Sequence, residues 1–223
     1  MKSINRLATA LGCLIPAALP AATATFDDLF APPALDAATG LRFTTGAVTS
    51  PLYEGVEWDD RVTVVGSQYK VAADAPLFGL PHSGNYFITN ESTDGGNGIT
   101  LNTTLILTSA WFGQNEYYGF GGGATSVTIT ALAGSTPLGS VTFDLQDQVD
   151  GQPEVLAPVD TSVFLTYSGI TGYRIDHVAP NEFAHNWVAD DFTFVPEPGI
   201  MAAVPAAAML GFAAGRRRRR RQA

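Results

Sequence analysis

Ser126-Val-Thr-Ile-Thr130 and Ser140-Val-Thr-Phe-Asp-Leu145 are the stretches that decide the fold class of this 223-residue chain. Polar and apolar side chains alternate in both, so each predicts a strand with one face in the core and one face in water. Other short runs of Val, Ile, Thr, Phe and Tyr lie between Gly, Asn, Asp and Pro clusters. They predict further strands at residues 61–65, 85–89, 99–108, 163–167, 172–176 and 191–194.

No internal segment shows a sustained apolar period of 3.6 residues, which an amphipathic helix would need. Strands that follow one another without helical crossovers pair antiparallel. The sequence therefore predicts an all-β fold, an antiparallel β-sandwich of jelly-roll-like type.

The N-terminal segment has the layout of a secretory signal peptide. Lys2 and Arg6 supply a positive start, residues 7–19 are apolar, and Ala22-Thr23-Ala24 ends the segment with the small residues of a cleavage site. We expect residues 1–24 to direct export through the Sec machinery and to be removed after Ala24. Because the apolar run continues past Cys13, the segment favours a plain signal peptide over a lipoprotein signal.

The C-terminal tail, residues 195–223, carries three features in a fixed order. The box Val195-Pro196-Glu197-Pro198-Gly199 comes first, residues 200–214 are apolar, and six arginines follow at 216–221. A spanning helix needs roughly 20 residues, but arginine side chains can snorkel and the bilayer can thin. We expect a short hydrophobic helix that holds an inner-membrane intermediate, with the arginines in the cytoplasm.

This tail resembles the PEP-CTERM sorting signal, which consists of the same box, a short hydrophobic helix and a terminal arginine cluster. The resemblance covers residues 195–221. It implies a Gram-negative host that makes extracellular polysaccharide, and an exosortase partner that cuts near the box. The expected destination is the cell surface or the extracellular matrix.

Residues 25–194 remain as one domain of ordinary size. They contain no cysteine, so no disulfide contributes to their stability. Their basic residues are only four, against 21 acidic residues that all lie between 27 and 197, which gives the exported part a formal charge near −17. Such a surface repels phosphate backbones, so nucleic acid is excluded as a partner. It attracts divalent cations, although acidity also serves solubility.

Two acidic pairs, Asp27-Asp28 and Asp190-Asp191, stand at the two ends of this domain. Residues 25–29, 53–58 and 188–194 resemble parts of the β-sandwich ectodomains found on such tails. In jelly rolls the first and last strands often lie together, which would bring the pairs close. Carboxylates held together repel unless a cation separates them, and Ca²⁺ takes six to eight oxygen ligands. We therefore expect a structural Ca²⁺ site, with strand ends capped in water as the alternative.

The segment Trp111-Phe-Gly-Gln114-Asn115-Glu-Tyr117-Tyr118 combines aromatic and amide side chains. Apolar sugar faces stack on aromatic rings while amides bond hydroxyl groups, so Trp111, Gln114, Asn115, Tyr117 and Tyr118 are candidate sugar-binding residues. The alternative is that Trp111 and one tyrosine belong to the core. Of the three tryptophans, Trp187 is the one we expect in the core.

The domain contains no G-x-S-x-G elbow, no H-E-x-x-H motif and no cysteine nucleophile. Its histidines, His82, His177 and His185, lack metal-ligand spacing along the chain. The sequence therefore predicts a non-catalytic surface or matrix module that binds extracellular polysaccharide. A structural matrix protein or adhesin that engages other proteins is one alternative, and a secreted glycan hydrolase or lyase is another.

Overall fold

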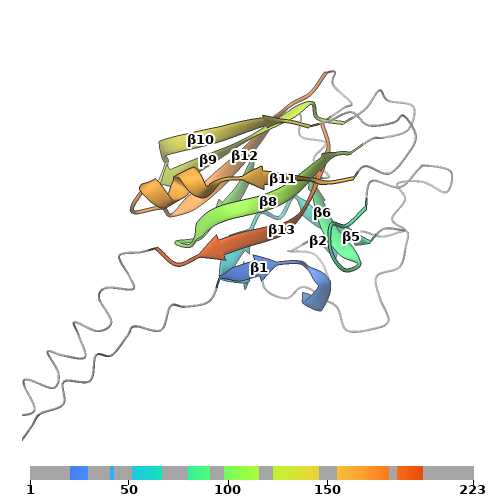
Figure 1. The fold of residues 1–223 in the computed structure, drawn as a ribbon, viewed down its shortest axis with the longest axis horizontal. Helices are drawn as coiled ribbons and strands as arrows, with labels where there is room; N and C mark the ends of the chain where they lie inside the picture. The colour runs from blue at the N-terminus through green and yellow to red at the C-terminus, as the bar shows by residue number, and fades with distance from the viewer. Residues whose placement is uncertain are drawn as a thin grey trace, which may run out of the picture. The chain divides into compact units, whose positions relative to one another are not determined.

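The computed structural model describes residues 21–29, 41–42, 52–66, 80–90, 98–115, 123–145, 155–180 and 185–197 (Figure 1). All of them belong to one compact unit, Pro20–Glu197. Residues 1–20 of the expected signal peptide and the expected hydrophobic helix at 200–214 lie outside the described residues. Within the described ranges, no helix has the length and apolar character needed to cross a membrane.

The strands form two antiparallel sheets, which confirms the predicted β-sandwich. The first sheet is seven-stranded, and its order is β11 (Ala157–Asp160), β8 (Ile106–Gln114), β13 (Trp187–Val195), β6 (Tyr86–Asn90), β5 (Val62–Gly66) and β2 (Leu41–Arg42), with β1 (Ala22–Ala24) also paired to β13. The second sheet is six-stranded, in the order β10 (Thr136–Asp144), β9 (Ser126–Ala133), β12 (Gly172–Val178), β7 (Ile99–Asn102), β4 (Val56–Trp58) and β3 (Leu52–Tyr53).

Aromatic rings from both sheets meet in the core. Trp58 of the second sheet packs edge-on against Phe192 of the first sheet, with ring centroids 5.2 Å apart, and against Phe26 at 5.1 Å. Phe112 packs on Phe192 at 5.5 Å and on Trp187 at 5.3 Å. Each ring that leaves water contributes roughly 2 to 3 kcal/mol. Trp187 is fully buried, as predicted.

The predicted strand at 99–108 is wrong as a single element, because the chain changes sheets within it. Residues 99–102 form β7 in the second sheet, and Ile106 begins β8 in the first. Thr103 causes the break: its hydroxyl donates to the Gly55 carbonyl and accepts from the Leu105 N–H, so these groups leave the ladder. Such side-chain bonds to the local backbone compete with strand pairing.

The predicted strand at 163–167 is also wrong, because these residues form the 3₁₀ helix η2 (Ser162–Thr166). Asp160 accepts the Ser162 N–H at 2.8 Å, which starts the turn. The helix buries Phe164 and leaves its neighbours exposed, so an alternating pattern here satisfied a turn of 3₁₀ helix as well as a strand.

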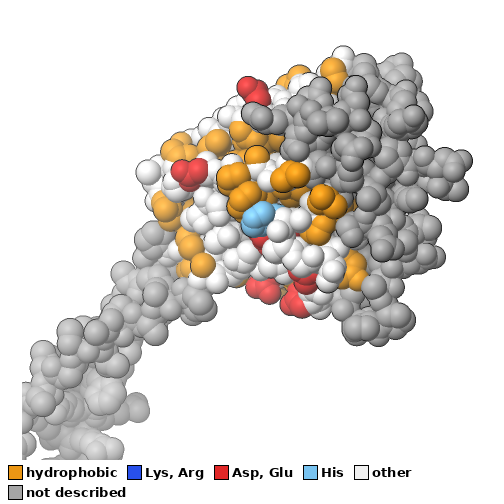
Figure 2. Space-filling view, turned by 45° about the vertical axis from the view of Figure 1, so that its right-hand side comes forward, with side chains coloured by type: hydrophobic (Ala, Val, Ile, Leu, Met, Phe, Trp, Pro, Cys, Tyr) orange, Lys and Arg blue, Asp and Glu red, His pale blue; other side chains and the backbone are white. Residues whose placement is uncertain are grey.

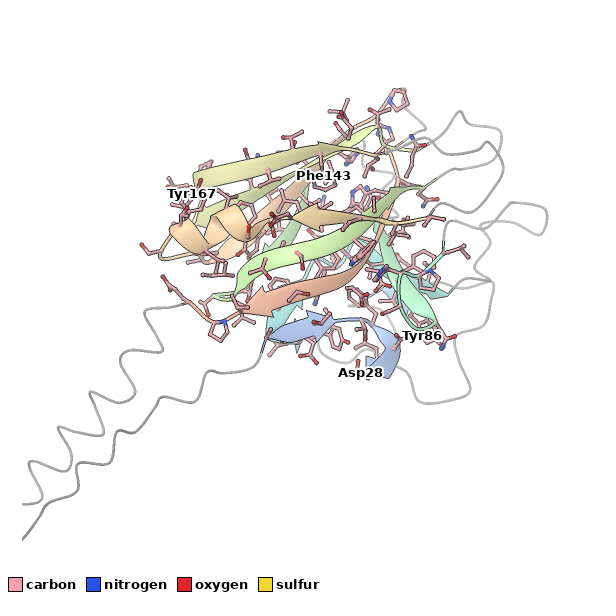
Figure 3. The ribbon with its side chains drawn as sticks, in the orientation of Figure 1. Asp28, Tyr86, Phe143 and Tyr167 are labelled. Carbon is pink, nitrogen blue, oxygen red and sulfur yellow. The ribbon has the colours of Figure 1, made fainter. Side chains whose placement is uncertain are left out.

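The residue after η2, Tyr167, covers one end of β10 (Figure 3). A Cβ atom at Gly139 of β10 would lie 2.1 Å from the Tyr167 Oη, so only glycine allows this approach. Nearer the other end of β10, Phe143 packs on Phe112 with centroids 5.2 Å apart. The two rings close the sandwich along its β10 side.

The first and last strands lie together, as the jelly-roll comparison predicted. Ala22, Thr23 and Ala24 of β1 pair with Phe194, Thr193 and Phe192 of β13. Ala24 is fully buried, and the Thr23 and Thr193 hydroxyls lie 3.4 Å apart. The sheet therefore begins at Ala22, inside the segment assigned above to the signal peptide.

A fragment that starts at residue 25 should be less stable than one that starts at residue 20, both ending at residue 197. Loss of the β1 pairing and of buried Ala24 costs roughly 1 to 3 kcal/mol, which corresponds to a melting temperature lower by about 3 to 10 °C. Thermal unfolding followed by circular dichroism measures the difference. Equal melting would mean that cleavage after Ala24 leaves the sandwich intact.

Candidate functional site

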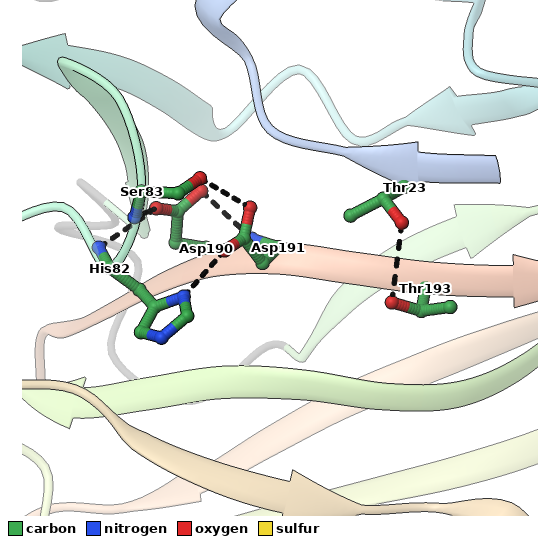
Figure 4. A network of polar contacts seen from close by, with 6 residues as sticks. All are labelled: Thr23, His82, Ser83, Asp190, Asp191 and Thr193. Atoms are coloured by element: carbon green, nitrogen blue, oxygen red, sulfur yellow. Dashed lines mark hydrogen bonds and ion pairs between the residues drawn. The ribbon is translucent and has the colours of Figure 1, made fainter.

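Asp191 interrupts the regular course of β13. Its φ angle of 49° lies in the left-handed region, which non-glycine residues rarely adopt, and the register with β8 shifts between Asp190 and Thr193. In a regular strand neighbouring side chains point to opposite faces. Here both carboxylates reach the same loop, at His82 and Ser83 (Figure 4). The bulge thus places two acidic side chains on one side of the sheet.

Asp190 is fully buried and holds the loop through its backbone. Its Oδ2 accepts the N–H groups of His82 at 2.9 Å and Ser83 at 3.1 Å, and its Oδ1 accepts the N–H of Asp191 at 2.8 Å. Burial raises the pKa of Asp190 to about 7; the N–H donors oppose this rise, and the neighbouring charge of Asp191 adds to it. Asp190 therefore changes its charge near neutral pH.

Asp191 binds the side chains of the same loop. Its Oδ2 lies 2.5 Å from His82 Nδ1, and its Oδ1 accepts the Ser83 hydroxyl at 2.8 Å. The imidazole of His82 stacks on the indole of Trp111, with centroids 3.4 Å apart and planes at 13°. Trp111 stands opposite Asp190 in the β8–β13 register. A residue predicted to bind sugar and two predicted to bind metal therefore form one cluster on the outer face of the first sheet.

The Ser83, His82 and Asp191 trio has the residue types of a hydrolytic triad but not its connections. A serine nucleophile needs its hydroxyl bonded to the histidine that accepts the proton. Here the Ser83 hydroxyl and the His82 ring both bond to the carboxylate of Asp191. The geometry holds a loop and a ring in place, which suits binding.

Asp27 joins the cluster from the other end of the chain. Its Oδ1 accepts the Asn85 N–H at 2.7 Å, and a Cβ atom at Gly84 (φ +58°) would collide with its carboxylate. Asp28 turns away and accepts the Tyr53 hydroxyl at 2.6 Å. Backbone N–H groups thus take the place that the sequence assigned to Ca²⁺. Among the described residues no group of three or more His, Cys, Asp or Glu is placed to hold a metal ion, and calcium binding stays a prediction.

The amides predicted to accompany Trp111 do not lie beside it. Trp111 points outward, whereas Gln114 and Asn115 are buried at 4% and 0% exposure. Gln114 Nε2 reaches the Gly123 carbonyl at 3.4 Å, and Asn115 Nδ2 donates to the Thr89 hydroxyl at 3.0 Å. The other two candidates, Tyr117 and Tyr118, lie outside the described residues.

The outer face of the first sheet around Trp111 is apolar. Trp111 packs partly against a second hydrophobic cluster, separate from the main core, whose members are Val65, Phe87, Leu156 and Val188. Leu80 and Val155 are exposed at 39% and 60%. On the face seen in Figure 2, hydrophobic side chains gather around a histidine with carboxylates beside it. A ligand that meets this face encounters rings, aliphatic carbon and acidic oxygen.

Sequence reasoning missed His82 and Ser83, which hold the two carboxylates. They lie more than 100 residues from Asp190 and Asp191 in the chain, so no local pattern joins them. It also missed Asn90, a buried side chain that bridges two backbone groups. Its Nδ2 donates to the His185 carbonyl at 3.0 Å, and its Oδ1 accepts the Trp187 N–H at 2.7 Å.

Comparisons with known proteins add little to this description. No family model matches the chain, and no curated protein matches it. Among solved structures, the K2 cleaved adhesin domain of Lys-gingipain is similar over 78% of this chain and 97% of that chain, with 14% identity and a TM-score of 0.41. A likeness at this level carries no argument about function.

The Asp190→Asn variant should change how stability depends on pH. The folded-state pKa of Asp190, about 7, lies above the ordinary value of 3.8, so the folded form keeps a proton that the unfolded form loses. Its contribution is complete below pH 3.8 and is lost as pH rises through 7. The free energy of unfolding should fall by roughly 2 to 4 kcal/mol over this range in wild type and less steeply in the variant.

Urea unfolding at a series of pH values measures this slope. Asp144→Asn, which alters an exposed carboxylate on β10, is the matched control and should keep the wild-type slope. Parallel curves for wild type and Asp190→Asn would contradict the assignment.

The Asn90→Ala variant should be strongly destabilised, because it leaves the Trp187 N–H and the His185 carbonyl without their partner. Two such losses in a buried place cost about 2 to 4 kcal/mol. Asn102→Ala removes an exposed amide that bonds Glu57 at 3.3 Å and should cost under about 1 kcal/mol. Equal effects in denaturant unfolding would show that the Asn90 bridge carries no weight.

Proposed function

We propose that this chain is an exported, non-catalytic β-sandwich of jelly-roll-like type that acts at the cell surface or in the extracellular matrix and binds exopolysaccharide. The observation that carries the proposal is the stacked pair of His82 and Trp111, set in an apolar face with Asp191 at its rim. Sugar rings offer apolar faces to such a surface. A carboxylate has about four acceptor positions, so Asp191 keeps capacity for sugar hydroxyls beyond its bonds to His82 and Ser83.

The stacking decides which ring meets the ligand. His82 covers one face of Trp111, and its own side chain is 34% exposed. The sugar would therefore lie against the imidazole and the free edge of the indole. Trp111 supports the platform from beneath, and Asp191 fixes the angle of the imidazole.

The proposed delivery route includes Sec export and processing by an exosortase at the box from Val195 to Gly199. Strand β13 ends at Val195, and Glu197 Oε1 accepts the Gly169 N–H at 2.8 Å. A cut beyond this point would leave every described strand in the domain. The position of the box just past the last strand supports its role as a removable tail.

An adhesin or structural matrix role is the second candidate, and the exposed side chains of Leu80 and Val155 favour it. Exposed apolar groups on one face are typical of surfaces that contact protein. A glycan hydrolase or lyase has less support, because the Ser83, His82 and Asp191 trio has no serine–histidine bond.

The Trp111→Ala variant of residues 20–197 should lose retention on polysaccharide. Affinity electrophoresis in gels that contain neutral or acidic bacterial polysaccharides measures the dissociation constant, and we expect it to rise about tenfold, or about 1.4 kcal/mol. Val163→Ala removes a side chain that is 45% exposed on η2 and is the control. Equal retention of Trp111→Ala and wild type would overturn the proposal.

A wild-type fragment that no polysaccharide retards would also overturn it. Self-association in sedimentation velocity that a Leu80→Ser, Val155→Ser double variant abolishes would support the adhesin or matrix role instead.

A further inference from the structure

Two histidines that the sequence keeps apart meet at one end of the sandwich. His177 lies on β12 of the second sheet, and His185 lies two residues before β13 of the first sheet. Their ring centroids are 5.7 Å apart and their planes make an angle of 70°. Both side chains are partly buried. They stand apart from the cluster around Trp111, which contains the remaining histidine, His82.

The ring spacing suits a shared metal ion. With metal–nitrogen bonds of about 2.1 Å, two imidazoles on one ion have centroids about 5 Å apart at a tetrahedral angle and about 6 Å apart when they lie opposite each other. The observed 5.7 Å falls between these values. Because the rings are not stacked face to face, rotation about the Cβ–Cγ bonds can direct a nitrogen of each at a point between them.

The backbone on both sides of this pair is held in place. His177 is paired with Val127 of β9. The His185 carbonyl accepts Asn90 Nδ2 at 3.0 Å, and the next carbonyl, that of Asn186, accepts the N–H groups of Asn115 and Ala124. A ligand pair on fixed backbone binds an ion with little loss of conformational freedom.

The surroundings keep His177 in the form that binds metal. Burial lowers the pKa of His177, and the nearby His185 lowers it further, while Asp176 acts in the opposite direction. A neutral imidazole presents a lone pair to a cation. Asp176 is bonded to Arg174 at 2.7 Å, and the strongly acidic domain attracts cations generally.

We propose that His177 and His185 form a two-histidine site for a divalent transition-metal ion of the Zn²⁺, Ni²⁺ or Cu²⁺ class. Imidazole nitrogen is a preferred ligand of these ions. Since no third His, Cys, Asp or Glu joins the pair among the described residues, water completes the coordination shell. The ion connects the two sheets, because its two ligands come from opposite layers of the sandwich.

This connection gives the site a readout other than binding itself. An ion that binds only the folded form stabilises it by mass action, and at 100 times its dissociation constant it raises the free energy of unfolding by about 2.7 kcal/mol. The full chain, purified without a polyhistidine tag and stripped with EDTA, is titrated with ZnCl₂ or NiCl₂. We expect calorimetry to show one site and the melting temperature to rise by several degrees.

His177→Asn and His185→Asn should each weaken binding at least tenfold and abolish the rise in melting temperature. His82→Asn is the matched control, because it removes the third histidine of the chain from another face, and it should keep both effects. Retention of binding in either of the first two variants, or its loss in His82→Asn, would overturn the proposal.

A spectroscopic measurement on wild type covers the case in which a variant fails to fold. Substoichiometric Ni²⁺ or Cu²⁺ should broaden the imidazole proton signals of His177 and His185 before those of His82. Broadening of all three histidines together would mean non-specific binding and would overturn the site.

Discussion

Hydrogen-bonded pairing along β13 is the constraint on which the rest of the sandwich depends. This strand pairs with β8 along its length, with β6 at Val188 and Ala189, and with β1 from Phe192 to Phe194. The change of partner along one edge coincides with the bulge at Asp191. A bulge increases the local twist and redirects side chains. The same distortion therefore lets β1 join the sheet and turns Asp191 to the side occupied by Asp190.

The acidic cluster is stable because backbone donors surround it. A buried carboxylate without partners would cost several kcal/mol, yet Asp190 accepts three N–H groups and Asp27 accepts a fourth from the same loop. The carboxylates thereby order the loop that carries His82, and His82 in turn lies flat on Trp111. Charge near the first and last strands becomes shape on the outer face of the sheet.

Much of the fold could be predicted from short-range pattern. The alternating stretches at 126–130 and 140–145 are strands β9 and β10, and they pair with each other. Pattern failed at residues 99–108 and 163–167, where the decisive contacts were the Thr103 hydroxyl and the Asp160 carboxylate. The candidate site was predicted in fragments: Trp111 and Asp190 were both singled out, but their adjacency and the part of His82 were not.

The sequence by itself determined the fold class, the acidity of the domain and the layout of its two ends, because these follow from local period, composition and order along the chain. Only the tertiary structure decided that Gln114 and Asn115 face inward while Trp111 faces outward, and that His177 approaches His185. Strand register and the bulge at Asp191 set these relations. Both arise from pairing between segments far apart in the chain, which no local pattern encodes.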